Sequence, residues 1–157
     1  MSRRRLLMAV VIVIVVLLSA ATAFGASGAL TAHLTGANEM PPVETKARGQ
    51  TVFMLSPDGM ELYYRLIVAN IQDVTAARIH LAPAGVNGPV VAYLFSGPLP
   101  GTINGDLAQG TLTSADLIGP LAGMAMDDLL DNIMSGDAYV NVHTLANPAG
   151  EIRGQIR

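Results

Sequence analysis

The amino-acid sequence predicts a mainly β domain, an antiparallel sandwich or Greek-key barrel with a single crossover helix. Its 157 residues correspond to one domain. Short runs rich in Val, Ile, Leu and Thr recur along the chain, and turn residues separate them about every 8–12 residues. Only one segment places its apolar residues at helical spacing. Together these observations favour a sandwich or barrel over an α/β architecture.

Seven or eight short strands are expected after the N-terminal segment. They span residues 30–34, 51–55, 61–69, 75–81, 90–95, 109–113, 139–144 and 151–156. The second and third form a hairpin, because Ser56-Pro57-Asp58-Gly59 between them is a strong turn signal. Pro41 and Pro42 force an extended connection after the first strand.

The helix is expected over residues 121–134, where the apolar positions are 121, 126, 129, 130, 133 and 134. Ser114 is read as the N-cap of a short turn that precedes it. Three methionines of this region should fill gaps in the core, with metal binding by their thioethers as the alternative: Met124, Met126 and Met134. Three aspartates form its solvated face and lack the spacing of a calcium loop: Asp127, Asp128 and Asp131.

The N-terminus has the pattern of a secretory signal peptide. Arg3, Arg4 and Arg5 precede the apolar run Leu6 to Leu18, whose thirteen residues fit a signal core of about 7–15 residues. A membrane-spanning helix needs about 20. Ala21-Thr22-Ala23 predicts cleavage before Phe24. The alternative is an uncleaved anchor, through which alone the protein would touch a membrane.

Cleavage after residue 23 would leave a small acidic domain, residues 24–157. It removes three of nine basic residues and none of the twelve acidic ones, so the formal net charge falls from −3 to −6. Such a charge disfavours nucleic acid as a partner. The absence of cysteine excludes disulfides, zinc–thiolate sites and cysteine nucleophiles.

Two of the three histidines are candidate metal ligands. His80 follows the apolar positions 77 and 79, and His143 follows 140 and 142, so alternation places both on the face away from the core. If their strands are neighbours, the imidazoles could meet there and hold copper or zinc. The alternative is that they hydrogen-bond to nearby loops or carboxylates. The face of His33, a weaker candidate for a third ligand, is ambiguous.

Charged residues suggest no enzyme. Arg153 could clamp a carboxylate such as Glu39, or be an ordinary surface arginine. The Walker, G-x-S-x-G and H-E-x-x-H motifs do not occur.

Three segments together resemble the CHRD (chordin) domain family. They are the opening residues 34–43 (LTGANEMPPV), a central pair of stretches at 76–80 (AARIH) and 84–91 (AGVNGPVV), and the closing stretches 139–144 (YVNVHT) and 148–156 (PAGEIRGQI). The resemblance implies a structural or binding role for the motif residues Glu39, Pro41, Pro42, Arg78, Asn87, Gly88, Asn141, Glu151 and Arg153.

The resemblance also implies an immunoglobulin-like barrel or sandwich, distantly similar to Cu/Zn superoxide dismutase. The family occurs in exported microbial proteins and in chordin, an extracellular antagonist of growth factors. By this similarity, His80 and His143 would lie near the copper ligands of the dismutases. Where the family pattern often has His-Ile-His, this chain has Arg78-Ile79-His80, which replaces one ligand by a cation. Dismutase activity is therefore not expected.

The sequence thus predicts an extracytoplasmic protein, either secreted, periplasmic or held at the cell surface. The first hypothesis is a non-enzymatic binding or structural module that recognises a protein or a small ligand. The second is a copper- or zinc-binding protein that uses His80 and His143. The third is a hydrolase or isomerase, for which the sequence offers no positive sign.

Overall fold

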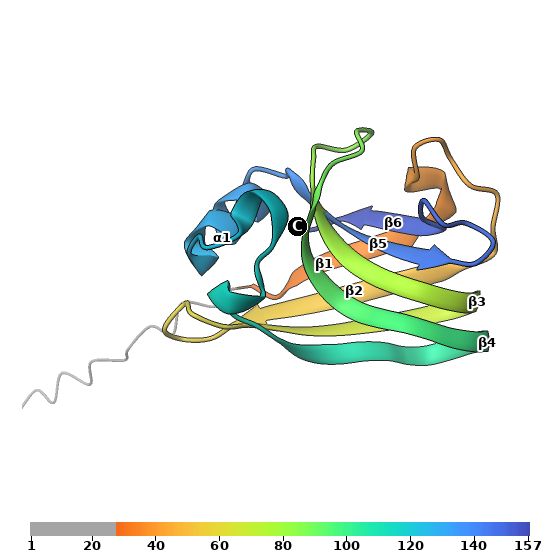
Figure 1. Ribbon diagram of the computed structural model, residues 1–157, viewed down its shortest axis with the longest axis horizontal. Coiled ribbons are helices and arrows are strands. Elements are labelled where there is room, and N and C mark those ends of the chain that lie inside the picture. The colour runs from red at the N-terminus through yellow and green to blue at the C-terminus, as the bar shows by residue number, and fades with distance from the viewer. Residues whose placement is uncertain (1–27) are drawn as a thin grey trace, which may run out of the picture.

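A computed structural model describes residues 28–157 as one antiparallel β-barrel with one α-helix (Figure 1). The expected signal peptide, residues 1–23, and its cleavage site before Phe24 lie outside these residues. Within residues 28–157, no helix is both long and apolar enough to span a bilayer.

Six strands build the sheet in the order β2-β1-β6-β5-β3-β4, and a further pairing of β2 with β3 closes it. The strands are β1 (Leu30–Thr35), β2 (Arg48–Leu55), β3 (Leu62–Leu81), β4 (Val90–Leu112), β5 (Ala138–Thr144) and β6 (Ile152–Gln155). The first half of β3 pairs with β2 and its second half with β5, while β4 follows its other edge. The predicted mainly β, antiparallel fold with one helix is confirmed.

Two of the strands are far longer than the sequence indicates. The expected strands 61–69 and 75–81 form the single strand β3, which bends at Asn70 and Asp73. Both residues have positive φ, at 54° and 51°, a conformation that Asn and Asp tolerate better than most residues. Strands 90–95 and 109–113 likewise join into β4. Pro98 and Pro100 do not interrupt it, because β4 pairs only with β3 and its other edge needs no N–H donors.

The helix is shorter than expected. Helix α1 covers Met126–Met134, and Leu121 lies in the preceding 3-10 turn η3 (Gly119–Leu121). Gly123, with φ of 76°, separates the two. Met126 is buried, but Met124 and Met134 are 41% and 77% exposed, so only one of the three methionines fills the core.

The expected cap at Ser114 is also wrong. Thr113 precedes the turn η2 (Ser114–Asp116), and its backbone N–H donates to Asp116 Oδ2 at 2.8 Å.

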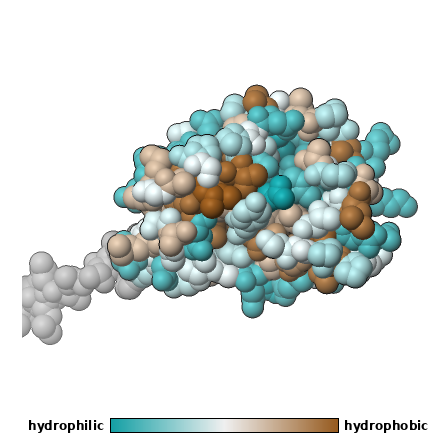
Figure 2. Space-filling model, viewed as in Figure 1, coloured by the Kyte–Doolittle hydropathy of each residue, from teal (hydrophilic) through white to brown (hydrophobic). Residues whose placement is uncertain are grey.

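The core fills the barrel and extends under α1. Strand residues such as Phe53, Leu66, Ile79 and Val140 are fully buried, and Leu129 and Ile133 of α1 join them. Figure 2 shows that apolar side chains on one face of the molecule gather beside α1, whereas most of that face is polar. On the outer face of β3, β5 and β6, by contrast, several polar side chains are buried.

Candidate functional site

Strand β5 is buried on both faces. Val140 and Val142 belong to the apolar core, whereas Tyr139, Asn141 and His143 alternate with them and pack beneath loops. His80 on β3 lies opposite Tyr139 in the register. Both histidines stay outside the apolar core, yet they are only 7% and 5% exposed. The face that the sequence assigns to the outside is therefore a second, polar interior.

The two imidazoles lie close together, and each is anchored to a loop through its Nδ1. Their ring centroids are 5.8 Å apart, with a 34° angle between the ring planes. His80 Nδ1 is 2.9 Å from the carbonyl oxygen of Gly88, and His143 Nδ1 is 3.0 Å from that of Pro148. A carbonyl only accepts, so each Nδ1 carries the proton. Both Nε2 atoms are then bare acceptors, and they are buried without a partner.

A stack of side chains continues from His80 toward β6. The ring of Tyr139 stacks on His80 with centroids 4.9 Å apart, and the guanidinium of Arg153 lies 3.4 Å from the centre of the Tyr139 ring. Arg153 donates to Asn87 Oδ1 at 3.0 Å and to the carbonyls of Val86 at 2.6 Å and Pro83 at 3.3 Å. This side chain, 1% exposed, thus holds the β3–β4 loop to the barrel.

Neither expectation for Arg153 holds. It is not a surface residue, and no ion pair joins it to Glu39: within residues 28–157 the only salt bridge is Arg65–Asp106. Its charge is instead balanced by carbonyl and amide oxygens and by an aromatic face.

Arg78, which replaces a potential third imidazole ligand, packs against Tyr93 on β4. It lies opposite Asn141 on β5 and Tyr93 on β4, and its Cζ is 5.4 Å from the centre of the Tyr93 ring. Its Nε is buried without a partner. The guanidinium thus contributes positive charge beside the histidine pair from the β4 side.

Glu39 reaches the same face from the loop that follows β1. It is 4% exposed and accepts a hydrogen bond at Oε2 from Asn141 Nδ2 at 3.3 Å. Its Oε1 and Asn141 Oδ1 are buried without partners. Both lie against Gly150, where an added Cβ would stand 2.7 Å from Glu39 Oε1 and 2.3 Å from Asn141 Oδ1. Gly150, with φ of 134°, is therefore required by close approach as well as by conformation.

The remaining motif residues tie loops over this face. Glu151 accepts from Thr45 Oγ1 and Thr144 Oγ1, each at 2.7 Å. Asn87 donates to the Met40 carbonyl at 2.8 Å and so joins the β3–β4 loop to the β1–β2 loop. Gly88 supplies the carbonyl for His80, and its N–H donates to Tyr139 Oη. Pro41 and Pro42 are exposed in the β1–β2 loop.

Burial shifts the pKa values of the ionisable groups in opposite directions. It raises the pKa of Glu39 to about 7, although the charge of Arg153 and the bond from Asn141 act the other way. Burial lowers the pKa of His143 to about 4, and it also lowers that of His80, to which the nearby arginine charges contribute. Both histidines are therefore neutral at pH 7, as a metal ligand must be.

Replacing Glu39 by Gln should expose the histidine contribution to stability. The pKa of Glu39 is about 7 in the folded state, against an ordinary value of 4.5. The contribution of Glu39 to the free energy of unfolding is therefore present below pH 4.5 and is lost as the pH rises to about 7. The contribution of His143 is present above its ordinary pKa of 6.5 and is lost as pH falls toward 4. The two effects oppose each other, each by up to about 3 kcal/mol.

In urea unfolding between pH 4 and 7, the Glu39→Gln variant should therefore lose more stability on acidification than the unmodified protein. The amide of Gln has nearly the shape of the carboxyl group, and its oxygen can accept from Asn141 Nδ2 as Glu39 Oε2 does, which keeps the packing. The exposed Glu44→Gln is the matched control and should follow the unmodified protein. If the Glu39 variant also follows it, Glu39 does not hold its proton in the folded state.

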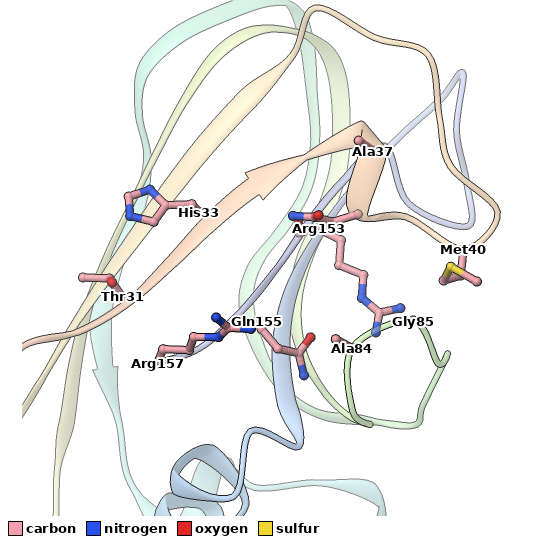
Figure 3. Close-up of a pocket in the computed structure, with 10 residues that line it drawn as sticks. Thr31, His33, Ala37, Met40, Ala84, Gly85, Arg153, Gln155 and Arg157 are labelled. Carbon is pink, nitrogen blue, oxygen red and sulfur yellow. The ribbon is translucent and has the colours of Figure 1, made fainter.

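A pocket of about 500 Å³ lies on the outer face of β1 and β6, beside this cluster (Figure 3). We call it the β1–β6 pocket. Its lining consists of Thr31, His33, Ala37, Asn38, Met40, Ala84, Gly85, Arg153, Gln155 and Arg157. Gln155 is fixed by two bonds from its Nε2, to the carbonyls of Ala82 at 2.8 Å and Gly136 at 2.7 Å, which leave its Oε1 available. Figure 3 shows Arg153 pointing to the loop at Gly85.

His33 lines this pocket and does not join the other two histidines. Within residues 28–157, no three side chains of His, Cys, Asp or Glu come together closely enough to form a metal site. Sequence reasoning missed Tyr139, Gly150 and Gln155. Alternation along β5 and β6 could have indicated Tyr139 and Gln155, which share faces with Asn141 and Arg153. Only the folded structure reveals the contact that Gly150 makes.

Comparison with known proteins identifies the family to which the chain belongs. Chordin of Xenopus laevis is 28% identical over 131 residues, an alignment that covers 78% of this chain but only 12% of chordin. The chain thus spans a small part of that relative's length. No solved structure matches it significantly. The CHRD domain matches residues 30–156, nearly all that the structure describes, and the chain therefore belongs to the CHRD domain family.

Proposed function

We propose that this protein is a non-enzymatic binding module that works outside the cytoplasm, with the β1–β6 pocket as its recognition surface. The observation that carries the proposal is the preformed floor of this pocket. Arg153 and Gln155 are each fixed by bonds to loop carbonyls, so little side-chain entropy remains to be lost on binding. A volume of about 500 Å³ is within the usual range of ligand sites.

The chemistry of the lining indicates what would bind. Arg153 and Arg157 contribute positive charge, no acidic side chain is among the lining residues, and Gln155 offers an acceptor. Met40 and Val86, which are 41% and 49% exposed, add apolar surface to the two loops that flank the pocket. An anionic or polar group of an extracytoplasmic protein, or of a small ligand, would fit this combination. Nucleic acid would not, because the domain as a whole is acidic.

The extracytoplasmic location is supported by the N-terminal pattern. The run from Leu6 to Leu18 behind three arginines, followed by Ala21-Thr22-Ala23, is typical of an export signal. A chain of this length can fold without disulfides, so the lack of cysteine is no objection.

Single-cysteine labelling tests the proposal, because the chain contains no cysteine of its own. Ala84→Cys places a photoreactive maleimide in the pocket. After illumination of the exported protein with extracytoplasmic extract, we expect one discrete adduct. N-terminal sequencing of the same sample should begin at Phe24, whereas an intact N-terminus would support the anchor alternative.

Two controls make this result specific. Ala115→Cys, exposed on η2 and outside the pocket lining, should not give the adduct. Adding Arg157→Glu to Ala84→Cys should reduce it, because the new carboxylate repels an anionic group. The same adducts from both cysteine positions, insensitive to Arg157→Glu, would rule out the pocket as the recognition surface.

A second candidate function is the binding of copper or zinc by His80 and His143. The observation that favours it is that each Nδ1 is anchored to a backbone carbonyl while each Nε2 is buried without a partner. Carbonyls that orient imidazoles in this way are typical of metal-binding histidines.

A further inference from the structure

The geometry of the pair His80 and His143 restricts which metal ion the two side chains can bind. His80 lies near the C-terminal end of β3, and His143 near the C-terminal end of β5. The two strands are antiparallel, so the loops that anchor the two Nδ1 atoms leave from opposite ends of the pair. In an imidazole ring Nε2 lies roughly opposite Nδ1. We therefore expect the two bare Nε2 atoms, each across its ring from the anchored Nδ1, to face the space between the rings.

The separation of the rings matches a single ion between them. Two metal–nitrogen bonds of about 2 Å each, plus the distance from each Nε2 to its ring centre, place the centroids about 6 Å apart. The observed separation is 5.8 Å.

The surroundings of the two histidines disfavour an ion that needs more than two ligands or carries more than one positive charge. Zinc in proteins takes four ligands, and within the described part of the chain no third His, Cys, Asp or Glu side chain joins the pair. Both Nε2 atoms are fully buried, which leaves little room for water as a replacement. The positive charges of Arg78 and Arg153 act on His80 and oppose a divalent ion more than a monovalent one.

We infer that His80 and His143 form a two-coordinate site for a monovalent d¹⁰ ion, Cu(I), with Ag(I) as its redox-stable analogue. Such ions accept two nitrogen ligands in a nearly linear arrangement without further coordination. This inference rests on the metal-binding candidate of the proposed function and specifies which ion it would take. It does not depend on the β1–β6 pocket.

The test is a set of anaerobic titrations of the exported protein with Cu(I), Ag(I), Cu(II) and Zn(II). We expect one Cu(I) per chain in competition with a chromogenic chelator, one Ag(I) per chain by calorimetry, and no stoichiometric uptake of either divalent ion. His80→Ala and His143→Ala should each abolish the uptake, and His33→Ala, at an exposed histidine, should leave it unchanged. Binding of the divalent ions alone would overturn the two-coordinate site and leave the metal-binding candidate standing. Binding of no ion tighter than about micromolar would overturn both.

A second measurement uses the unmodified protein and so does not depend on the folding of a variant. On ¹⁵N-labelled protein, bound silver should split the Nε2 resonances of two histidines by direct coupling to the silver nucleus, and leave their Nδ1 resonances unsplit. Splitting at any other nitrogen would overturn the assignment.

Arg78→His supplies the converse experiment. It would remove a cation and place a third imidazole opposite Asn141, on the face that holds the pair. Uptake of Zn(II) or Cu(II) should then appear where the unmodified protein shows none. Unchanged rejection of divalent ions by a folded Arg78→His variant would mean that neither ligand number nor charge sets the preference.

Discussion

Arg153→Ala should lower the free energy of unfolding by about 3–5 kcal/mol, more than most single substitutions in this chain. The substitution removes a buried guanidinium that donates to Asn87 Oδ1 and to two loop carbonyls and packs on the Tyr139 ring. The acceptors would be left without donors, and the aromatic ring would border a cavity. Urea unfolding at pH 7 measures the loss.

Arg65→Ala is the matched control, because Arg65 makes an ion pair at 2.7 Å with Asp106 while both side chains are more than half exposed. Its loss should stay below about 1 kcal/mol. Arg153→Lys should recover little, since an ammonium group cannot reproduce the planar fork that reaches several acceptors. Equal losses at positions 65 and 153 would show that Arg153 does not hold the β3–β4 loop.

Gly88→Ala should be at least as damaging, with an expected loss of about 4 kcal/mol or more. A Cβ at this position would stand 1.8 Å from the carbonyl oxygen of Leu81, and a backbone atom cannot rotate away as a flexible side chain can. The β3–β4 loop would have to leave the end of β3, and the bond from His80 Nδ1 to the Gly88 carbonyl would break with it. Urea unfolding measures the stability, and the ¹⁵N spectrum of His80 reports whether Nδ1 keeps its proton.

Gly28→Ala is the control for this substitution, since nothing lies within 4 Å of a Cβ placed there and its φ is not positive. It should be neutral within about 0.5 kcal/mol. A small effect of Gly88→Ala, with the His80 signal unchanged, would mean that the loop can move without cost.

The sequence predicts the positions of the strands well, and their ends poorly. Residues 51–55 and 139–144 fall within observed strands because Val, Thr, Tyr and Phe alternate there without a breaker. The gaps left between the expected strands, at residues 70–74 and 96–108, do not end β3 and β4, because long-range pairing between these strands continues past them with register shifts. Local turn signals cannot reveal whether a neighbouring strand carries the pairing onward.

In the candidate site, too, the sequence predicts some features and only the folded structure shows the others. Alternation along β3 and β5 is a local property of the chain, so it places His80 and His143 off the apolar core from the sequence alone. Alternation does not reveal that loops bury both rings, that Arg78 leans on Tyr93, or that Glu39 shares a buried space with Asn141 and Gly150.

By itself, the sequence determined the mainly β architecture, the family motifs and the side of the sheet on which the histidines lie. Only the tertiary structure decided that Arg153 is a buried anchor and that both Nε2 atoms lack partners. The physical reason is distance along the chain: Arg153 is bonded to Val86 and Asn87, and Asn141 to Glu39, across separations of 66 to 102 residues. Such contacts depend on how the barrel closes, which no local pattern specifies.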